Sequence, residues 1–191
     1  QELAERTNMD VSTLQGFVSA LAKTHEYFAQ VGCVASDHAL TEPVSYPVED
    51  SWAADIYNKA LEGKGLRQSE INDFKAFMMY QFGKMNRDAG WITQLHIGAL
   101  RDYRDSLYEK LGPDSGGDLS TNYIEIAKGL KYFLNEFAED AKVVLYCLDP
   151  THLPTIATIS RAFPNVSIGA AWWFNDSPYG MEQHLRYCST V

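Results

Sequence analysis

Residues 143–150 read VVLYCLDP, a continuous apolar run that ends at Asp149 and Pro150. Such a run is typical of a strand buried on both faces, because a half-exposed strand would alternate apolar and polar residues. A helix is predicted on each side of the run, over about residues 122–138 and over residues 153–162. Helices before and after a buried strand indicate crossover connections, and therefore a parallel sheet.

Three more segments are predicted to be strands of the same sheet: residues 33–35, which lead into Ser36-Asp37-His38, residues 91–97, which are followed by Gly98, and residues 166–174. Further helices are predicted over about residues 10–32, 49–62, 69–88 and 100–110, and from about residue 177 onward. No composition shift marks a second domain. Residues 1–191 are therefore predicted to form one domain, with a helical insertion at about 43–88.

The predicted fold class is α/β, with about four parallel strands and flanking helices. A closed (β/α)₈ barrel needs eight strands and typically about 250 residues. The chain has 191 residues. Two architectures therefore fit the pattern, which are part of such a TIM-type barrel and an open sheet in a complete small protein.

Composition and charge exclude several classes of function. Hydrophobic residues make up 46% of the chain and charged residues 21%, which is typical of a globular protein, and the formal net charge is −9. An acidic chain is a poor partner for nucleic acid or for an anionic membrane surface, since both require basic groups. No apolar stretch is long enough to span a membrane. Cys33, Cys147 and Cys188 form no CxxC pattern, so we expect free thiols in the reducing cytoplasm.

Asp37 and His96 are the strongest candidates for chemistry, because each lies near the carboxyl end of a predicted strand. Sites in α/β barrels and open α/β sheets gather at that end. His96 would share a face with Ile92 and Gln94, and its imidazole suits proton transfer or the polarisation of a carbonyl. The alternatives are that Asp37 caps the following loop and that His96 is a hydrogen-bonded core residue.

Arg101, Trp172 and Trp173 are weaker candidates for ligand binding. Arg101 follows the glycine turn after the 91–97 strand and could bind a substrate carboxylate, or could form an ordinary surface salt bridge. Trp172 and Trp173 would alternate between the two faces of the last strand, so one indole should face inward. That indole could form the wall of a sugar pocket, or simply belong to the core.

Five motifs, in order, resemble the uronate (glucuronate) isomerase family: GCVASDH at 32–38, WITQLHIGALR at 91–101, LGPDSG at 111–116, LYCLDP at 145–150 and WWFND at 172–176. The resemblance implies a (β/α)₈ barrel of the amidohydrolase type that interconverts glucuronate with fructuronate and galacturonate with tagaturonate. The four strands would be the fourth to the seventh. The resemblance also implies that Asp37 and His96 contact the substrate, that Trp172 and Trp173 line the pocket, and that Arg101 binds substrate.

The same resemblance implies a divalent metal, usually zinc, held by an HxH motif on the first barrel strand and an Asp on the last. The chain contains neither, and it also lacks an Arg that the family places before Gln1. The family's usual GPDTG is replaced here by Asp114-Ser115-Gly116-Gly117. We therefore expect part of an isomerase, nearly inactive alone, whose partners are a uronic acid sugar and either a second copy or the missing half of the barrel. The alternatives are a metal-dependent hydrolase with His96 as a ligand, and a non-catalytic relative.

Overall fold

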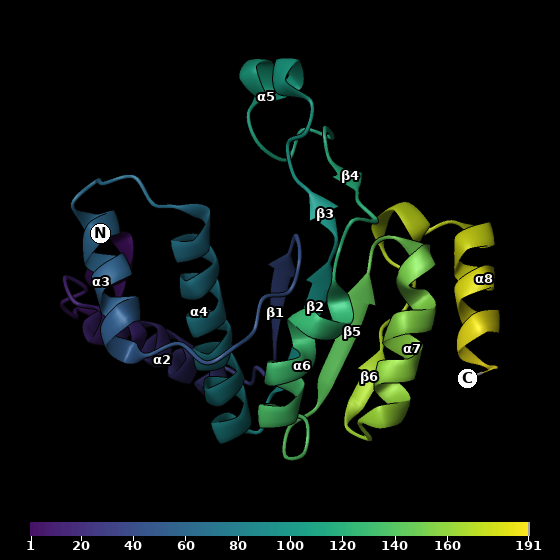
Figure 1. Cartoon of the computed structure of the whole chain (residues 1–191), viewed down its shortest axis with the longest axis horizontal. Coiled ribbons are helices and arrows are strands. Elements are labelled where there is room, and N and C mark those ends of the chain that lie inside the picture. The colour runs from purple at the N-terminus through teal and green to yellow at the C-terminus, as the bar shows by residue number, and fades with distance from the viewer. Residues whose placement is uncertain (191) are drawn as a thin grey trace.

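The computed structural model describes residues 1–190, and a four-stranded parallel sheet lies at the centre of the fold (Figure 1). Its strands, in spatial order, are β1 (Ala35–Leu40), β2 (Ile92–Ile97), β5 (Val143–Cys147) and β6 (Val166–Ile168). All three pairings in this sheet are parallel, with Ala35 opposite Ile92 and Val143 opposite both Thr93 and Val166. The prediction of four parallel strands is confirmed.

Helices make up most of the remaining structure. They are α1 (Glu2–Thr7), α2 (Leu14–Gln30), α3 (Asp50–Leu61), α4 (Gln68–Ala89), α5 (Asp105–Leu111), α6 (Ile126–Phe137), α7 (Leu153–Ala162) and α8 (Pro178–Cys188), with short 3₁₀ turns at Pro150–His152 and Trp173–Asn175. The predicted helices over 69–88 and from about residue 177 onward are confirmed. Gly90 ends α4 with φ of 69°, and the Ser177 side chain accepts a hydrogen bond from Gly180 N at the start of α8. No described helix is long and apolar enough to cross a membrane.

The two faces of the sheet differ in kind. One face packs against α4, α6 and α7, and this layer buries an apolar core that includes Leu95, Leu145, Phe133, Phe137 and Ile156. The opposite face carries side chains that are exposed or half-buried, namely Asp37, Ala39, Ile92, Gln94, His96, Val144, Tyr146 and Ser167. The strict alternation within β2 shows how the sequence specifies both faces at once, since successive residues of a strand point to opposite sides.

Strand β1 corrects the sequence prediction. The strand runs from Ala35 to Leu40, not over residues 33–35, so Asp37 lies within it and not after it. The apolar pattern was misleading because the helix-facing side of β1 carries two polar residues, Ser36 and His38. These hydrogen-bond to each other at 2.9 Å between Oγ and Nε2. Burial lowers the pKa of His38 below its usual value, which favours the neutral ring at this position.

The side chain of Asn86, in α4, forms hydrogen bonds to β1, β2 and α2. Its side chain is 1% exposed. Its Nδ2 donates to Ser36 Oγ at 2.6 Å and to Thr93 Oγ1 at 2.7 Å, so one amide of α4 joins β1 to β2. Its Oδ1 lies 3.0 Å from Nε2 of His25 in α2, and the ring of His25 stacks on Trp91. The polar side of β1 is thereby satisfied inside the fold.

Four other predicted boundaries are wrong. The predicted helix over 10–32 is shorter, because α2 begins at Leu14, where the Thr13 side chain caps it, while Asp10 accepts from Ser12 N in the turn between α1 and α2. The predicted helix over 100–110 begins only at Asp105, and the one over 122–138 begins at Ile126. The last strand stops at Ile168 and does not reach residue 174.

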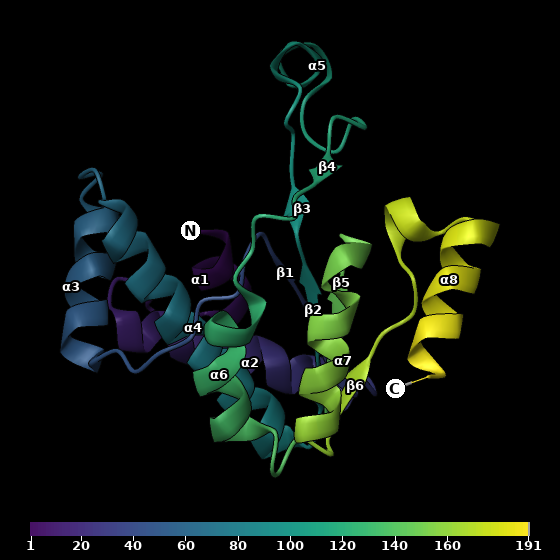
Figure 2. The same cartoon turned by 45° about the vertical axis from the view of Figure 1, so that its right-hand side comes forward.

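The segment 98–121 forms an arm that projects beyond the carboxyl end of β2 (Figures 1 and 2). It consists of the two-residue strands β3 (Ala99–Leu100) and β4 (Leu119–Ser120), which pair antiparallel, with α5 between them. Gly98 begins the arm with φ of 102°, a conformation that L side chains rarely adopt. No sequence pattern predicts these strands, since two residues are too few to show a period.

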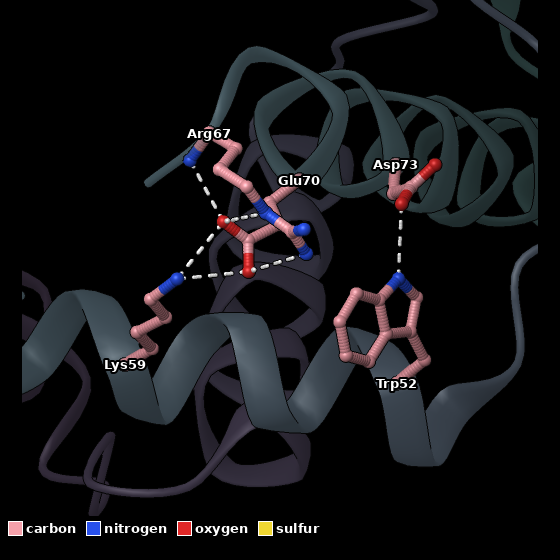
Figure 3. A network of polar contacts seen from close by, with 5 residues as sticks. All are labelled: Trp52, Lys59, Arg67, Glu70 and Asp73. Atoms are coloured by element: carbon pink, nitrogen blue, oxygen red, sulfur yellow. Dashed lines mark hydrogen bonds and ion pairs between the residues drawn. The ribbon is translucent and has the colours of Figure 1, made fainter. Parts of the chain in front are cut away.

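The insertion between β1 and β2 contains α3 and α4, which are joined by a buried carboxylate (Figure 3). Glu70 is 3% exposed, and each of its oxygens accepts from Lys59 Nζ at 2.9 Å. The backbone N–H of Arg67 also donates to Glu70 at 2.7 Å. These bonds, that of the Arg67 N–H first, hold the pKa of Glu70 at about 2, below its ordinary 4.5.

We expect the contribution of Glu70 to stability to depend on pH. A carboxyl whose folded pKa is depressed stabilises the fold above its unfolded pKa and loses that effect as pH falls toward the folded pKa. The stability of wild type relative to Glu70→Gln should therefore fall as pH drops from about 4.5 toward about 2. Urea unfolding across this range measures it, with the exposed Glu109→Gln as control. A difference between wild type and Glu70→Gln that does not change over the range would contradict the expectation.

We also expect Asn86→Ala to lower the free energy of unfolding by about 1–3 kcal/mol, the usual cost of leaving buried polar groups without a partner. The substitution removes the donor to Ser36 and Thr93 and the contact with His25. Asn135→Ala is the matched control, because this exposed asparagine bonds only to the Lys131 carbonyl of its own helix. Urea unfolding measures the free energy of unfolding of both variants. If Asn86→Ala lowers it no more than Asn135→Ala does, the hydrogen bonds of Asn86 do not stabilise the fold.

Candidate active site

Asp37 and His96 meet on the open face of the sheet, although they are 59 residues apart in sequence. The parallel register of β1 and β2 places Asp37 opposite Gln94, two residues before His96 on the same face, and Oδ1 of Asp37 lies 2.6 Å from Nδ1 of His96. The His96 side chain is 14% exposed and that of Asp37 is 56% exposed. The structure thus brings together the two residues singled out by the sequence. Their chemical roles stay a prediction.

Aromatic rings enclose the imidazole of His96 on two further sides. The ring of Tyr146, from β5, stacks on it with centroids 4.1 Å apart and planes 9° from parallel. The indole of Trp172 meets it edge to face at 4.4 Å and 64°. Such contacts restrict the orientation of a ring, because both neighbours would lose favourable geometry if it turned.

Tyr146 is itself held on both sides. Its hydroxyl donates to Oε1 of Gln94 at 2.8 Å, one layer deeper on the same face of the sheet. Gly169 lies on its other side, just after β6, and a Cβ there would overlap the ring carbons of Tyr146. The backbone of Gly169 is fixed by bonds from its N–H to Leu145 O at 2.9 Å and from His184 Nε2 to its carbonyl at 2.7 Å.

The placement of Trp172 and Trp173 corrects the prediction that they alternate on a strand. β6 has ended by then, and Trp173 begins a 3₁₀ turn with φ of 54°. The two indoles lie next to each other, with centroids 5.4 Å apart. Trp172 therefore packs on His96 while Trp173 continues the row of rings away from it.

Arg101 is at the base of the arm and reaches this row of rings. Its guanidinium lies 4.7 Å from the centroid of Trp173, a cation–π contact. Nη1 also pairs with Asp118 at 3.1 Å and with Asp114 at 3.4 Å, and the Asp118 side chain is only 5% exposed. Arg101 thus links the arm to the Trp172–Trp173 segment, and its role in substrate binding stays a prediction.

Sequence reasoning missed Tyr146 and Gly169. Tyr146 lies in the apolar run 143–148, where every residue looks equally buried, so nothing marks the residue that faces the open side. Gly169 carries no side chain to notice. The available signal was register, because Tyr146 pairs with His96 across β2 and β5.

The described residues contain no group of three or more His, Cys, Asp or Glu side chains that could hold a metal ion. The divalent metal that the resemblance implies therefore does not fit a site built from residues 1–190 alone. Asp37 and His96 are bonded to each other in this geometry. The chemistry they offer is that of a carboxylate-oriented imidazole facing an open polar surface.

The model of the glucuronate isomerase family matches residues 1–191, the whole chain. The chain belongs to this family. It is 65% identical over 191 residues to a uronate isomerase of Thermotoga sp. (strain RQ2), and it spans 42% of the length of that relative. The glucuronate isomerase family thus includes the chain over its full extent, while the relative extends well beyond it.

Solved structures agree with this assignment. The crystal structure of uronate isomerase from Thermotoga maritima matches with a TM-score of 0.98 and 64% identity, over 100% of this chain and 42% of that one. That of glucuronate isomerase from Caulobacter crescentus matches with a TM-score of 0.91 and 26% identity, over 98% and 40%. The expected fold, four parallel strands and flanking helices of a TIM-type barrel, is confirmed.

We expect Gly169→Ala to lower the free energy of unfolding by about 1–3 kcal/mol, the usual cost of overpacking. The added methyl would overlap the Tyr146 ring, and the bonded backbone of residue 169 cannot withdraw. Gly65→Ala is the control, since a Cβ there meets nothing within 4 Å. Chemical denaturation compares the two variants. A Gly169→Ala protein as stable as Gly65→Ala would show that the ring has room to move.

Proposed function

We propose that the protein containing this chain is a uronate isomerase, which interconverts alduronic and ketouronic acids such as glucuronate with fructuronate and galacturonate with tagaturonate. The observation that carries the proposal is the Asp37–His96 pair on the open face of two neighbouring barrel strands. Membership of the glucuronate isomerase family and the names of the relatives support the choice of substrate class. Because the chain spans 42% of the relatives' length, the remainder would supply further groups.

Aldose–ketose isomerisation moves a hydrogen between C1 and C2. When it moves as a proton, the path passes through a cis-enediolate, whose developing negative charge must be stabilised and whose oxygens must exchange protons. His96 suits this task because Asp37 occupies Nδ1 and leaves Nε2 to face the substrate. Because Nδ1 carries the proton donated to Asp37, we assign to Nε2 the acceptance of a proton from a substrate hydroxyl, after which its N–H can stabilise the enediolate oxygen and return the proton. We assign to Asp37 the orientation of the imidazole, with its second oxygen free to hold a hydroxyl.

The carboxylate of a uronic acid requires a cation, and Arg101 is the candidate in this chain. Both of its ion pairs, with Asp114 and Asp118, use Nη1. A guanidinium presents donors on all three nitrogens, so Nε and Nη2 could bind a substrate carboxylate as a fork. Trp172 and Trp173 would form the apolar wall against which the sugar ring lies.

A divalent metal, usually zinc, would belong to the complete enzyme. Residues 1–190 hold no group of three or more His, Cys, Asp or Glu side chains that could bind it, so ligands would have to come from other parts of an amidohydrolase-type barrel. We assign no step of the reaction to it. The half-exposed open face of the sheet, which carries Asp37 and His96, would be covered either by those other parts or by a second copy, since exposed apolar area is costly.

The three cysteines favour the cytoplasm as the site of action. Cys33, Cys147 and Cys188 are all free. Burial raises the pKa of Cys147 to about 11 and also raises that of Cys188, so both thiols are protonated near neutral pH. Unpaired, unreactive thiols suit a reducing compartment.

In the full-length protein, we expect His96→Ala to lower kcat by about 10²-fold or more, the usual scale for a group that exchanges protons or stabilises an oxyanion. The assay follows the interconversion of glucuronate and fructuronate, with galacturonate in parallel. His152→Ala is the control, because this histidine bonds to the Asn122 carbonyl outside the site. Wild-type-like turnover in His96→Ala would remove His96 from the mechanism, and a wild type without uronate isomerase activity would overturn the proposed function.

A further inference from the structure

We propose that Tyr146 is a positioning residue, which fixes the plane of the His96 imidazole so that Nε2 is held toward the substrate. This inference rests on the proposed function for its kinetic consequence. Its structural part, that the Tyr146 ring limits the orientation of the His96 ring, is supported by the stacking contact between them, with centroids 4.1 Å apart and planes 9° from parallel.

Asp37 alone cannot fix the imidazole. A single hydrogen bond at Nδ1 holds one atom of the ring, and the carboxylate that accepts it is 56% exposed. An exposed carboxylate can rotate and follow the ring. The orientation of the plane therefore needs a second constraint, and a parallel ring in van der Waals contact supplies it.

Tyr146 can act as a constraint because it is held from three directions. Its hydroxyl is anchored to Gln94, its ring faces His96, and Gly169 closes the side nearest β6. The sheet order β2-β5-β6 places Tyr146 between the strand of His96 and the residue that follows β6. The Tyr146 ring is thus a spacer between the Gly169 backbone and the imidazole.

The hydroxyl of Tyr146 is not the acting group. Its proton is donated to Gln94 Oε1 at 2.8 Å. The ring is the part that touches the imidazole, so Tyr146→Phe keeps the constraint and Tyr146→Leu removes it. A small misplacement of a catalytic group is enough to slow the chemical step while binding of the substrate is retained.

The kinetic test uses the full-length protein and a double-mutant cycle between Tyr146 and His96. We expect Tyr146→Leu to lower kcat about 10-fold and to change KM by less than about 3-fold. Tyr146→Phe should retain most of the wild-type kcat, because it keeps the ring. In the His96→Ala background, Tyr146→Leu should cause no further loss, because its effect acts through the imidazole. Tyr123→Leu, at a residue that is 94% exposed, is the matched control.

Two kinetic outcomes would overturn the inference. If Tyr146→Leu lowers kcat as much in the His96→Ala background as in wild type, the residue acts on the fold in general. If Tyr146→Phe is as slow as Tyr146→Leu, the hydroxyl is the active part. Should Tyr146→Leu fail to fold, Gly169→Ala replaces it in the cycle, since its methyl would displace the ring without removing it.

A second readout does not depend on catalysis. In protein with ¹⁵N-labelled histidine, the nitrogen shifts of His96, identified by their absence from His96→Ala, report which ring nitrogen carries the proton. We expect a single Nδ1-protonated form in wild type and averaged signals in Tyr146→Leu. Unchanged His96 signals in Tyr146→Leu would overturn the inference. A wild type that lacks isomerase activity would overturn only the proposed function, because these signals can still be measured.

Discussion

The buried amide of Asn86 is the contact on which the arrangement of strands and site depends. Buried polar groups must be hydrogen-bonded, and the helix-facing side of β1 carries Ser36 and His38 where an apolar pair would be ordinary. Asn86 makes this side acceptable by donating to Ser36 and to Thr93 of the next strand. Asp37 lies between the two polar residues, so the alternation of the strand directs its carboxylate to the opposite face, toward His96.

One face of the sheet packs into the apolar core, and the other face carries the candidate site. Along β2, Thr93, Leu95 and Ile97 are buried under helices, while Gln94 and His96 lie on the face that carries the candidate site. The apolar layer can tolerate no charge, and the open face needs polar groups of fixed orientation. One strand meets both demands because neighbouring residues never share a face. Glu70, the most deeply buried carboxylate among the described residues, lies at the start of α4 and not in the sheet.

The sequence predicted those elements whose burial follows a simple pattern. The run 143–148 and the alternation in 91–97 became β5 and β2 within one residue of the predicted ends, and α7 matched its predicted range of 153–162. β1 was misplaced because its polar residues are satisfied by a partner about 50 residues away, which no local pattern shows. Trp172 and Trp173 were placed on a strand because they are apolar, yet their backbone forms a 3₁₀ turn. Asp37 and His96 were found from strand position and motif, whereas Tyr146 was hidden in a uniformly apolar run.

The surroundings of His96 have a consequence for the order of events during synthesis. Its contacts come from Asp37, Tyr146 and Trp172, which are spread over most of the chain. Contacts this distant in sequence form only after long loops have closed. A ribosome adds roughly 5–20 residues per second, so several seconds separate the emergence of Asp37 from that of Trp172. The carboxylate of Asp37 and the imidazole of His96 are thus both exposed to water in the nascent protein before the aromatic contacts of Trp172 can form.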